Sequence, residues 1–303
     1  MDKEIETPLV SIVCDTYNHV NYIRQCLDGF LMQETNFPIE ILVHDDASTD
    51  GTADIVKEYE SRYPNLIKPI YQTENQYSKG VKVTLEYQYS RAKGKYIAFC
   101  EGDDYWTDPL KLQKQVDFLE SNPDCILTCH HYKILNGIAE DGSANWIRPI
   151  STFDLKYYIG SEWFIQPLTV VFRAKILDLN EYRKYECSKD VTLFYYLLRH
   201  GKGYFFQDEM AVYRLHSGGT YSNLSWEKKL VADLRTINAI SVVENDENAA
   251  TLLKRYLDKT VEFVGRKTLL KEWRLFCGVL RQLRPYYGGI GIIRLLLKLD
   301  SKS

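Results

Sequence analysis

The first hundred residues alternate between two hydrophobic periods, and this alternation restricts the folds open to the chain more than any other feature. Continuous apolar runs typical of strands covered on both faces occur at 9–16, 39–45, 68–71 and 95–100. Helical spacing of apolar residues lies between them, after Asn18, around 55–59 up to Pro64, and over 81–92. This β-α-β-α-β-α-β order predicts an α/β fold with a mostly parallel sheet and helices on both of its faces.

Polar side chains follow three of the predicted strands. These strand ends read Asp15-Thr16-Tyr17-Asn18, Asp45-Asp46 and Glu101-Gly102-Asp103-Asp104. In parallel sheets, ligands bind beyond the carboxyl ends of the strands, so we expect these residues to lie together. Helix capping would explain one acid per loop. Adjacent pairs of carboxylates on one edge repel each other unless a cation lies between them, and Mg²⁺ or Mn²⁺ is the simplest such ion.

Several classes of protein are disfavoured by what the chain lacks. It has no G-x-x-x-x-G-K-[ST] loop and no G-x-G-x-x-G after the first strand, so neither a P-loop enzyme nor a dinucleotide-binding dehydrogenase is supported. The net charge of −3 predicts no bulk attraction to nucleic acid. No apolar run reaches the roughly 18 to 20 residues of a membrane-spanning helix.

The seven cysteines predict a reduced protein that faces the cytoplasm. Their number is odd, most lie in apolar runs, and the short charged stretch 1–7 does not have the pattern of a secretory signal. Cys125, Cys129, His130 and His131 are close enough in sequence to suggest zinc. A buried strand is favoured here, because no second pair of ligands follows at finger spacing.

Four ordered motifs give the chain its resemblance to a known family. They read "VSIVCDTYN", "ILVHDDASTDGT", "AKGKYIAFCEGDDYW" and "SKDVTLFYYLLRHGKGYFFQDEMAVYRLHSGG". Over residues 9–220 the chain resembles the family 2 glycosyltransferases of the GT-A fold, inverting enzymes that build bacterial polysaccharides. The resemblance implies a nucleoside-diphosphate sugar donor, with a UDP-sugar favoured, a divalent metal (Mn²⁺ or Mg²⁺), and a hydroxyl acceptor on a glycan or a lipid-linked glycan.

The resemblance also implies residues that bind the nucleotide. These are Thr16, Tyr17, Asn18, Asp45, Asp46, Lys79 and Asp103. Thr16, Tyr17 and Asn18 would line the base pocket, where a tyrosine suits stacking. Helix capping is the alternative for the pair at 45–46, and a solvated turn is the alternative for Lys79-Gly80.

A second group of residues is implied for the metal and the chemistry. Asp104 and His216 would bind the ion, although Glu101 stands where the family's Asp-x-Asp motif begins. Asp190 would be the general base, and the alternative is a helix N-terminal acid stabilised by the macrodipole. Contacts with the donor or acceptor are expected from Glu101, Trp106, Gln166 and Arg214, with a core position slightly favoured for Trp106.

The charge distribution indicates a separate C-terminal segment. Residues 265–303 hold nine basic and two acidic residues, a balance of +7 that leaves −10 for the rest of the chain. We expect a nucleotide-sugar half at 1–110, an acceptor and catalytic half at 111–222, and a helical extension at 223–303. Its basic amphipathic pattern favours a cytoplasmic protein held peripherally on an anionic membrane. The alternative is a helical hairpin that packs on the catalytic body or forms a dimer.

Two other functions compete with an inverting glycosyltransferase of surface polysaccharide synthesis. One is a catalytically silent module that binds a sugar nucleotide or a glycan. The other is a sugar-phosphate nucleotidyltransferase, which would want a Gly-rich basic loop after the first strand, where Asp15-Thr16-Tyr17-Asn18 stands instead.

Overall fold

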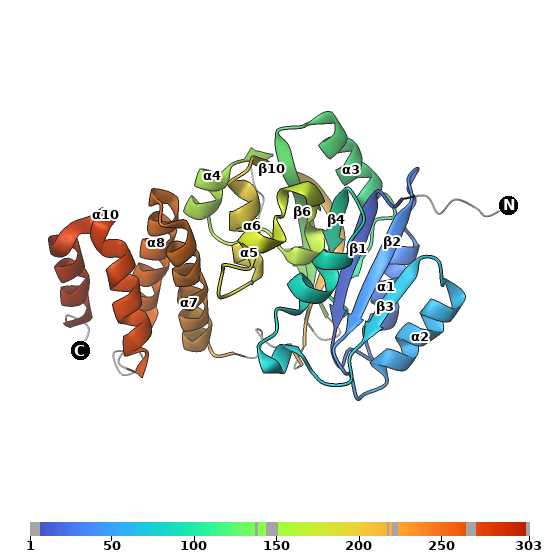
Figure 1. The fold of residues 1–303 in the computed structure, drawn as a ribbon, viewed down its shortest axis with the longest axis horizontal. Coiled ribbons are helices and arrows are strands. Elements are labelled where there is room, and N and C mark those ends of the chain that lie inside the picture. Colours follow the sequence, from blue (N-terminus) through green and yellow to red (C-terminus); the bar gives the residue numbers. More distant parts are fainter. Residues whose placement is uncertain are drawn as a thin grey trace. The chain divides into compact units, whose positions relative to one another are not determined.

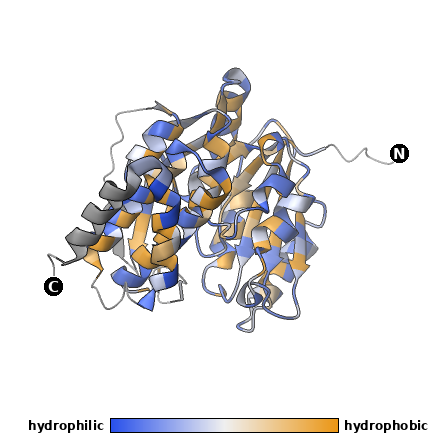
Figure 2. Cartoon of the chain, turned by 60° about the vertical axis from the view of Figure 1, so that its left-hand side comes forward, coloured by the Kyte–Doolittle hydropathy of each residue, from blue (hydrophilic) through white to orange (hydrophobic). Residues whose placement is uncertain are grey.

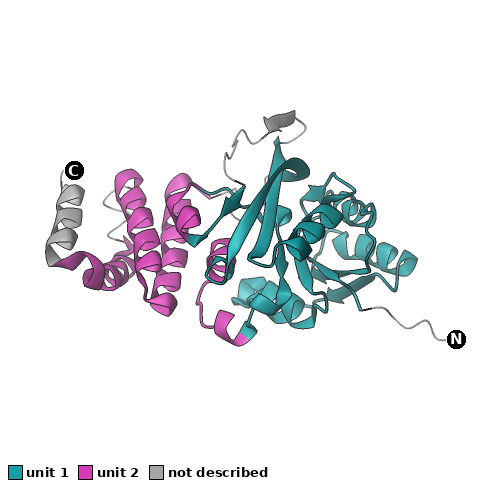
Figure 3. Ribbon diagram, turned by 90° about the horizontal axis from the view of Figure 1, so that it is seen from above, with its two compact units in different colours: residues 1–155, 163–179, 197–216 teal, residues 156–162, 180–196, 217–303 magenta. Residues whose placement is uncertain are grey.

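The structure is a computed structural model that describes residues 7–136, 139–143, 151–216, 218–219, 224–264 and 271–300, without the side chains of 139–143 and 289–300. The chain divides into two compact units (Figure 3). Unit 1 comprises residues 1–155, 163–179 and 197–216, and unit 2 comprises residues 156–162, 180–196 and 217–303.

Unit 1 is built on one sheet (Figure 1). Its described strands are β1 (Val10–Thr16), β2 (Ile39–Asp45), β3 (Ile67–Tyr71), β4 (Tyr96–Phe99), β5 (Tyr105–Trp106), β6 (Cys125–Asn136), β7 (Ala139–Ser143), β8 (Thr152–Phe153), β9 (Val171–Arg173) and β10 (Lys202–Leu215). The order is β3-β2-β1-β4-β9-β6-β10-β5, with β7 beside β6 and β8 beside β10. The first four strands pair in parallel, as predicted, while β9 runs antiparallel between β4 and β6.

Three α-helices follow strands of unit 1, and the first two lie where the sequence predicts helices. They are α1 (Ile23–Leu31), α2 (Thr52–Arg62) and α3 (Lys111–Ser121). Hydrophobic residues line the strands and one side of these helices (Figure 2). Each fully buried large apolar side chain contributes about 1.5–3 kcal/mol relative to an exposed one, so this layer of residues dominates the stability of unit 1.

The segment expected to form a helix over 81–92 has a different geometry. It contains a π-helical turn, η2 (Thr84–Gln88), followed by a 3₁₀ turn, η3 (Tyr89–Arg91). The Gln88 amide donates to the backbone oxygens of Cys14 and Leu42, each at 2.9 Å. The predicted helix is present over most of this segment, but its geometry is π and 3₁₀, and it places a side-chain amide against the sheet backbone.

Unit 2 contains most of the remaining helices. They are α4 (Leu155–Gly160), α5 (Leu179–Tyr182), α6 (Asp190–Leu198), α7 (Trp226–Glu244), α8 (Glu247–Phe263) and α10 (Trp273–Asp300), which is interrupted at Gly288 with a φ of 64°. The phenol of Tyr195 donates to Asp246 at 3.2 Å, and this carboxylate also caps α8 by accepting the Ala249 N–H at 2.7 Å. None of the helices in the described part of the chain combines the length and apolar character that crossing a bilayer requires.

A lysine lies inside the core of unit 1. Lys111 is 0% exposed, its Nζ lies 4.0 Å from the centre of the Trp106 ring, and it donates to Gln115 Oε1 at 2.8 Å. The Gln115 amide in turn donates to the backbone oxygen of Thr169 at 2.9 Å. Burial lowers the pKa of Lys111 to about 7, because the charged form loses its hydration.

This lysine gives a testable dependence of stability on pH. The pKa is about 7 in the folded state and 10.5 without burial, so the folded protein binds fewer protons between these values and its stability rises with pH. We expect the free energy of unfolding of Lys111→Met to lack this rise, which reaches at most about 1.4 kcal/mol per pH unit. Urea unfolding of both proteins at neutral and alkaline pH measures the difference, and equal slopes would show that the lysine does not titrate in this way.

Candidate functional site

The carboxyl ends of β1, β2 and β4 meet at one edge of the sheet. Thr16 is the register partner of Asp45, and the Asp46 N–H donates to the backbone oxygen of Thr16 at 3.0 Å. The Gly102 N–H donates to the backbone oxygen of Asp15 at 3.0 Å. The three polar loops are therefore neighbours, as the sequence predicts.

Asn18 joins the first two loops. Its backbone has a φ of 56°, a left-handed conformation that Asn adopts more readily than most residues. Its N–H donates to Ser48 Oγ, and its side-chain oxygen accepts the Thr49 N–H, both at 2.9 Å. Beside it, Tyr17 is 44% exposed, whereas Thr16 is buried. Asn18 thus braces the loops and leaves the tyrosine ring open to a ligand.

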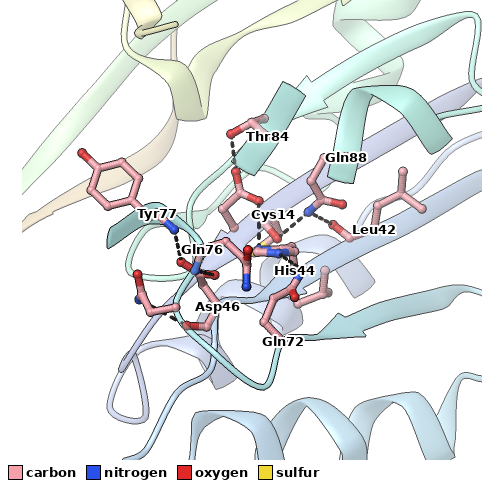
Figure 4. Close-up of polar contacts among 12 residues, drawn as sticks. Cys14, Leu42, His44, Asp46, Gln72, Gln76, Tyr77, Thr84 and Gln88 are labelled. Atoms are coloured by element: carbon pink, nitrogen blue, oxygen red, sulfur yellow. Dashed lines mark hydrogen bonds and ion pairs between the residues drawn. The ribbon is translucent and has the colours of Figure 1, made fainter. Parts of the chain in front are cut away.

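Asp46 holds a further loop against this edge. Its carboxylate accepts the Gln76 N–H at 2.8 Å and the Tyr77 N–H at 3.0 Å (Figure 4). These bonds fix the 3₁₀ turn η1 (Tyr77–Lys79). Lys79 ends this turn, where its ammonium pairs with Glu74 and is half exposed. Both oxygens of Asp46 are therefore used by the protein's own backbone.

Four buried polar atoms at the ends of β1 and β2 have no hydrogen-bond partner among the described residues. They are Thr16 Oγ1, Asp45 Oδ1, and the pair Asp15 Oδ1 and His44 Nδ1, which lie 3.9 Å from each other. Leaving such a group unsatisfied costs about 1–3 kcal/mol, so their clustering points to a polar ligand. Burial raises the pKa of Asp15 to about 6, against the effect of the hydrogen bond from Thr84, and burial also raises the pKa of Asp45.

The turn after β4 forms an acidic cluster. One carboxylate oxygen from each of Glu101, Asp103 and Asp104 lies within 4.8 Å of the others. Asp104 is buried and accepts the Arg214 N–H at 2.8 Å. Burial and the neighbouring Asp103 raise the pKa of Asp104 well above its usual value. Among the described residues, this is the one cluster of three potential ligands at such spacing, so the cysteines of β6 do not join one.

The structure pairs His216 with Asp103 rather than with Asp104. The Nε2 of His216 lies 3.0 Å from Asp103 Oδ2, while Asp103 Oδ1 is buried without a hydrogen-bond partner in the described part of the chain. Burial would raise the pKa of Asp103, but His216 and His19 lower it below its usual value. Carboxylate oxygens with one imidazole are a donor set that suits Mn²⁺, and close carboxylates need a cation between them. The residues therefore fit a divalent ion.

His19 belongs to this cluster and is not among the site residues predicted from the sequence. Its Nε2 lies 3.7 Å from Asp103 Oδ2. Its position directly after Asn18, in a strand-end loop, is the signal that would have identified it. Arg214 is also present, as expected, but its guanidinium donates to the Asp103 backbone oxygen and to Gln25 Oε1, so it supports the turn.

Two other predicted residues are Trp106 and Gln166. Trp106 is 1% exposed and donates to the Leu168 oxygen at 2.9 Å, so its ring packs in the core and offers no surface to a sugar. Gln166 is partly exposed and precedes the 3₁₀ turn η4 (Pro167–Thr169). Its backbone oxygen accepts the Thr169 N–H at 3.0 Å.

Asp190 begins α6 in unit 2, whereas the acidic turn is in unit 1. It is accessible to solvent, yet desolvation by the surrounding chain raises its pKa to about 6, and the positive charge of Lys189 opposes this rise. A carboxylate with this pKa is largely ionised at pH 7 and still basic enough to take a proton.

Comparison with known proteins agrees with this geometry. The model of the family described as "Glycosyl transferase family 2" matches residues 11–178, more than half of the chain. An uncharacterized protein of Mycobacterium tuberculosis is 37% identical over 230 residues, which cover 73% of this chain and 62% of that protein. The chain thus spans less than two thirds of the length of this relative.

A second relative is named for its substrates, and a solved structure is a complex with a sugar nucleotide. The UDP-Glc:alpha-D-GlcNAc-diphosphoundecaprenol beta-1,3-glucosyltransferase WfaP of Escherichia coli is 37% identical over 113 residues, 37% of this chain and 42% of WfaP. The crystal structure of S. aureus TarS 1–349 with UDP-GlcNAc has a TM-score of 0.64 at 20% identity, covering 89% of this chain and 79% of that one. The resemblance noted in the sequence is confirmed: the chain has the GT-A fold and belongs to glycosyltransferase family 2.

Proposed function

We propose that this protein is an inverting glycosyltransferase that moves a sugar from a nucleoside-diphosphate sugar to a hydroxyl acceptor in bacterial surface polysaccharide synthesis. The observation that carries the proposal is the acidic turn 101–104 with His216, placed beside the polar ends of β1 and β2. In a family 2 chain, this edge is where a nucleotide and its diphosphate would bind together.

The nucleotide would lie on the loops after β1 and β2. The exposed ring of Tyr17 would stack on the base, because aromatic side chains offer a flat apolar face. Thr16 and Asp45 have buried oxygens without partners that would bind polar groups of the base or ribose. Asp46 and Asn18 would shape the pocket through the backbone they hold. A UDP-sugar is the favoured donor, since TarS binds UDP-GlcNAc.

A divalent ion, Mn²⁺ or Mg²⁺, would be held by Asp103, Asp104 and His216, with Glu101 at the exposed side of the turn. Such an ion neutralises charge that develops on the leaving diphosphate. The chain's own contribution is to hold these side chains in place: the Arg214 backbone anchors Asp104, and the Arg214 guanidinium anchors the Asp103 backbone.

Asp190 would act as the general base. Its carboxylate would take the proton of the acceptor hydroxyl as that oxygen bonds to the anomeric carbon. The bond from this carbon to the diphosphate oxygen breaks in the same step, and its electron pair leaves with the nucleotide. One displacement inverts the configuration and needs no covalent sugar–enzyme intermediate.

The acceptor would be a glycan or a lipid-linked glycan, with Gln166 as a candidate contact. WfaP is named for an acceptor carried on diphosphoundecaprenol, and this relative supports a lipid-linked substrate here. We propose a cytoplasmic protein held on the inner face of the membrane by the basic tail. Arg274, Arg281 and Arg284 are exposed on α10 and would contact anionic headgroups.

Donor binding tests the nucleotide and metal parts of the proposal. Titration calorimetry with UDP, GDP and CDP, with and without Mn²⁺, should show one preferred nucleotide whose affinity rises with the ion. Asp104→Ala should weaken ion and nucleotide binding together by about tenfold or more, since it removes a ligand from the turn. The same ion dependence in wild type and variant would contradict this role of Asp104.

Asp190→Asn tests the base and separates an enzyme from a silent binding module. We expect glycosyl transfer to fall by about 10²–10⁴-fold, while ion-dependent nucleotide affinity stays near that of the wild type. Because the pKa of Asp190 is about 6, the wild-type rate should fall as the pH drops below this value and protonates the base. Initial rates of nucleotide release across pH 5–8 measure both effects, and normal turnover by the variant would exclude this residue as the base.

Flotation with liposomes tests the membrane contact of the tail. Arg281→Glu with Arg284→Glu should reduce binding to anionic vesicles by roughly 2 kcal/mol, or about 30-fold, at about 1 kcal/mol per basic residue. The matched control, Lys57→Glu with Arg62→Glu, changes two basic residues on α2 and should float as the wild type does. Equal flotation of the two double variants would refute a specific role for α10.

A further inference from the structure

Two histidines from distant parts of the sequence approach the same oxygen of Asp103. His216 Nε2 lies 3.0 Å from Oδ2, and His19 Nε2 lies 3.7 Å from it. The two rings are perpendicular, with centroids 6.1 Å apart. His216 approaches from the end of β10, whereas His19 belongs to the loop between β1 and α1. The carboxylate of Asp103 is thus flanked by imidazoles from two different elements.

His19 is part of a side-chain face that supports the site. His19, Tyr22 and Gln25 are spaced by three residues, which places them on one side of the turn that starts α1. The Tyr22 ring lies 4.6 Å from the His216 ring and 5.3 Å from the Arg214 guanidinium, while Gln25 accepts a hydrogen bond from Arg214. Through these contacts the face touches both Arg214 and His216. These are the two residues at the end of β10 whose described hydrogen bonds reach the acidic turn.

The chemistry of His216 gives His19 a specific task. A histidine nitrogen either carries a proton, and so donates to a carboxylate, or uses its lone pair to bind a cation. If His216 Nε2 binds the proposed ion, it no longer donates to Asp103 Oδ2. The His19 Nε2 is then the neighbouring donor for that oxygen. Without such a donor the carboxylate of Asp103 could rotate over a broad range of its terminal torsion angle.

We propose that His19 is a positioning residue: it restrains the Asp103 carboxylate from the β1–α1 side and so fixes the direction of its other oxygen, Oδ1. Oδ1 is buried and has no hydrogen-bond partner among the described residues, so its direction matters for binding an ion. The inference rests on the proposed divalent-ion site. It concerns how the chain aligns Asp103, and it assigns no chemical step to His19.

The affinity of the full chain for Mn²⁺ tests the role of His19. Free Mn²⁺ is measured by electron paramagnetic resonance for the wild type, His19→Leu, His19→Ala and His19→Gln. Leu keeps bulk without a donor, Ala removes both, and Gln restores an N–H near the position of Nε2. We expect the dissociation constant to rise about tenfold in the Leu and Ala variants, the loss typical of a residue that orients a metal ligand. Gln should recover most of the affinity.

The control is His200→Leu, an exposed histidine in the turn after α6, which should bind Mn²⁺ as the wild type does. Thermal unfolding shows which variants are folded. The test needs only one of the Leu and Ala variants to be folded. Wild-type affinity in a folded Leu or Ala variant would overturn the inference and leave the proposed function standing. A Gln variant as weak as Leu would also overturn it, because the donor would then be irrelevant. Failure of the wild type to bind Mn²⁺ would overturn both proposals.

Discussion

The parallel pairing of β1 with β2 and β4 is the constraint on which the rest of unit 1 depends. β1 lies between the other two strands, with Val10 opposite Ile39 on one side and Tyr96 on the other. Because all three strands run in the same direction, their polar ends emerge at one edge. The buried apolar residues that alternate along them stabilise this arrangement, and the loops inherit their proximity from it.

At this edge the two pairs of adjacent acids have two roles: they hold the chain in place, and they offer oxygens to a ligand. Asp46 accepts backbone N–H groups from the start of η1, and Asp104 accepts one from Arg214 on β10, so both hold the chain in place. Asp45 and Asp103 each keep a buried oxygen without a partner in the described part of the chain. Each pair thus helps to build the site and keeps the capacity to bind, and the backbone bond to Asp104 orients a carboxylate that would also hold the ion. Helix capping does not describe what Asp46 does, because its carboxylate fixes a separate 3₁₀ turn.

Features that depend on local sequence could be predicted, whereas features that depend on contacts between distant residues could not. The strand 39–45 and the acidic turn at 101–104 follow from hydrophobic periodicity and from the strand-end rule. The π-helical turn at 84–88 did not, because its geometry follows from where the Gln88 amide finds backbone acceptors on β1 and β2. His19 was a possible candidate by its position in a strand-end loop, but its role beside Asp103 is visible only in the tertiary structure.

The sequence by itself determined the class of fold, the order of its first four strands and helices, and the family, because these depend on short-range patterns and on motifs in a fixed order. The tertiary structure alone decided which carboxylate meets His216 and that Lys111 is buried against the ring of Trp106, whose core position the sequence already favoured. These features depend on side chains brought together from elements far apart in the chain. Their energies come from burial and from hydrogen bonds that exist only once the sheet has formed.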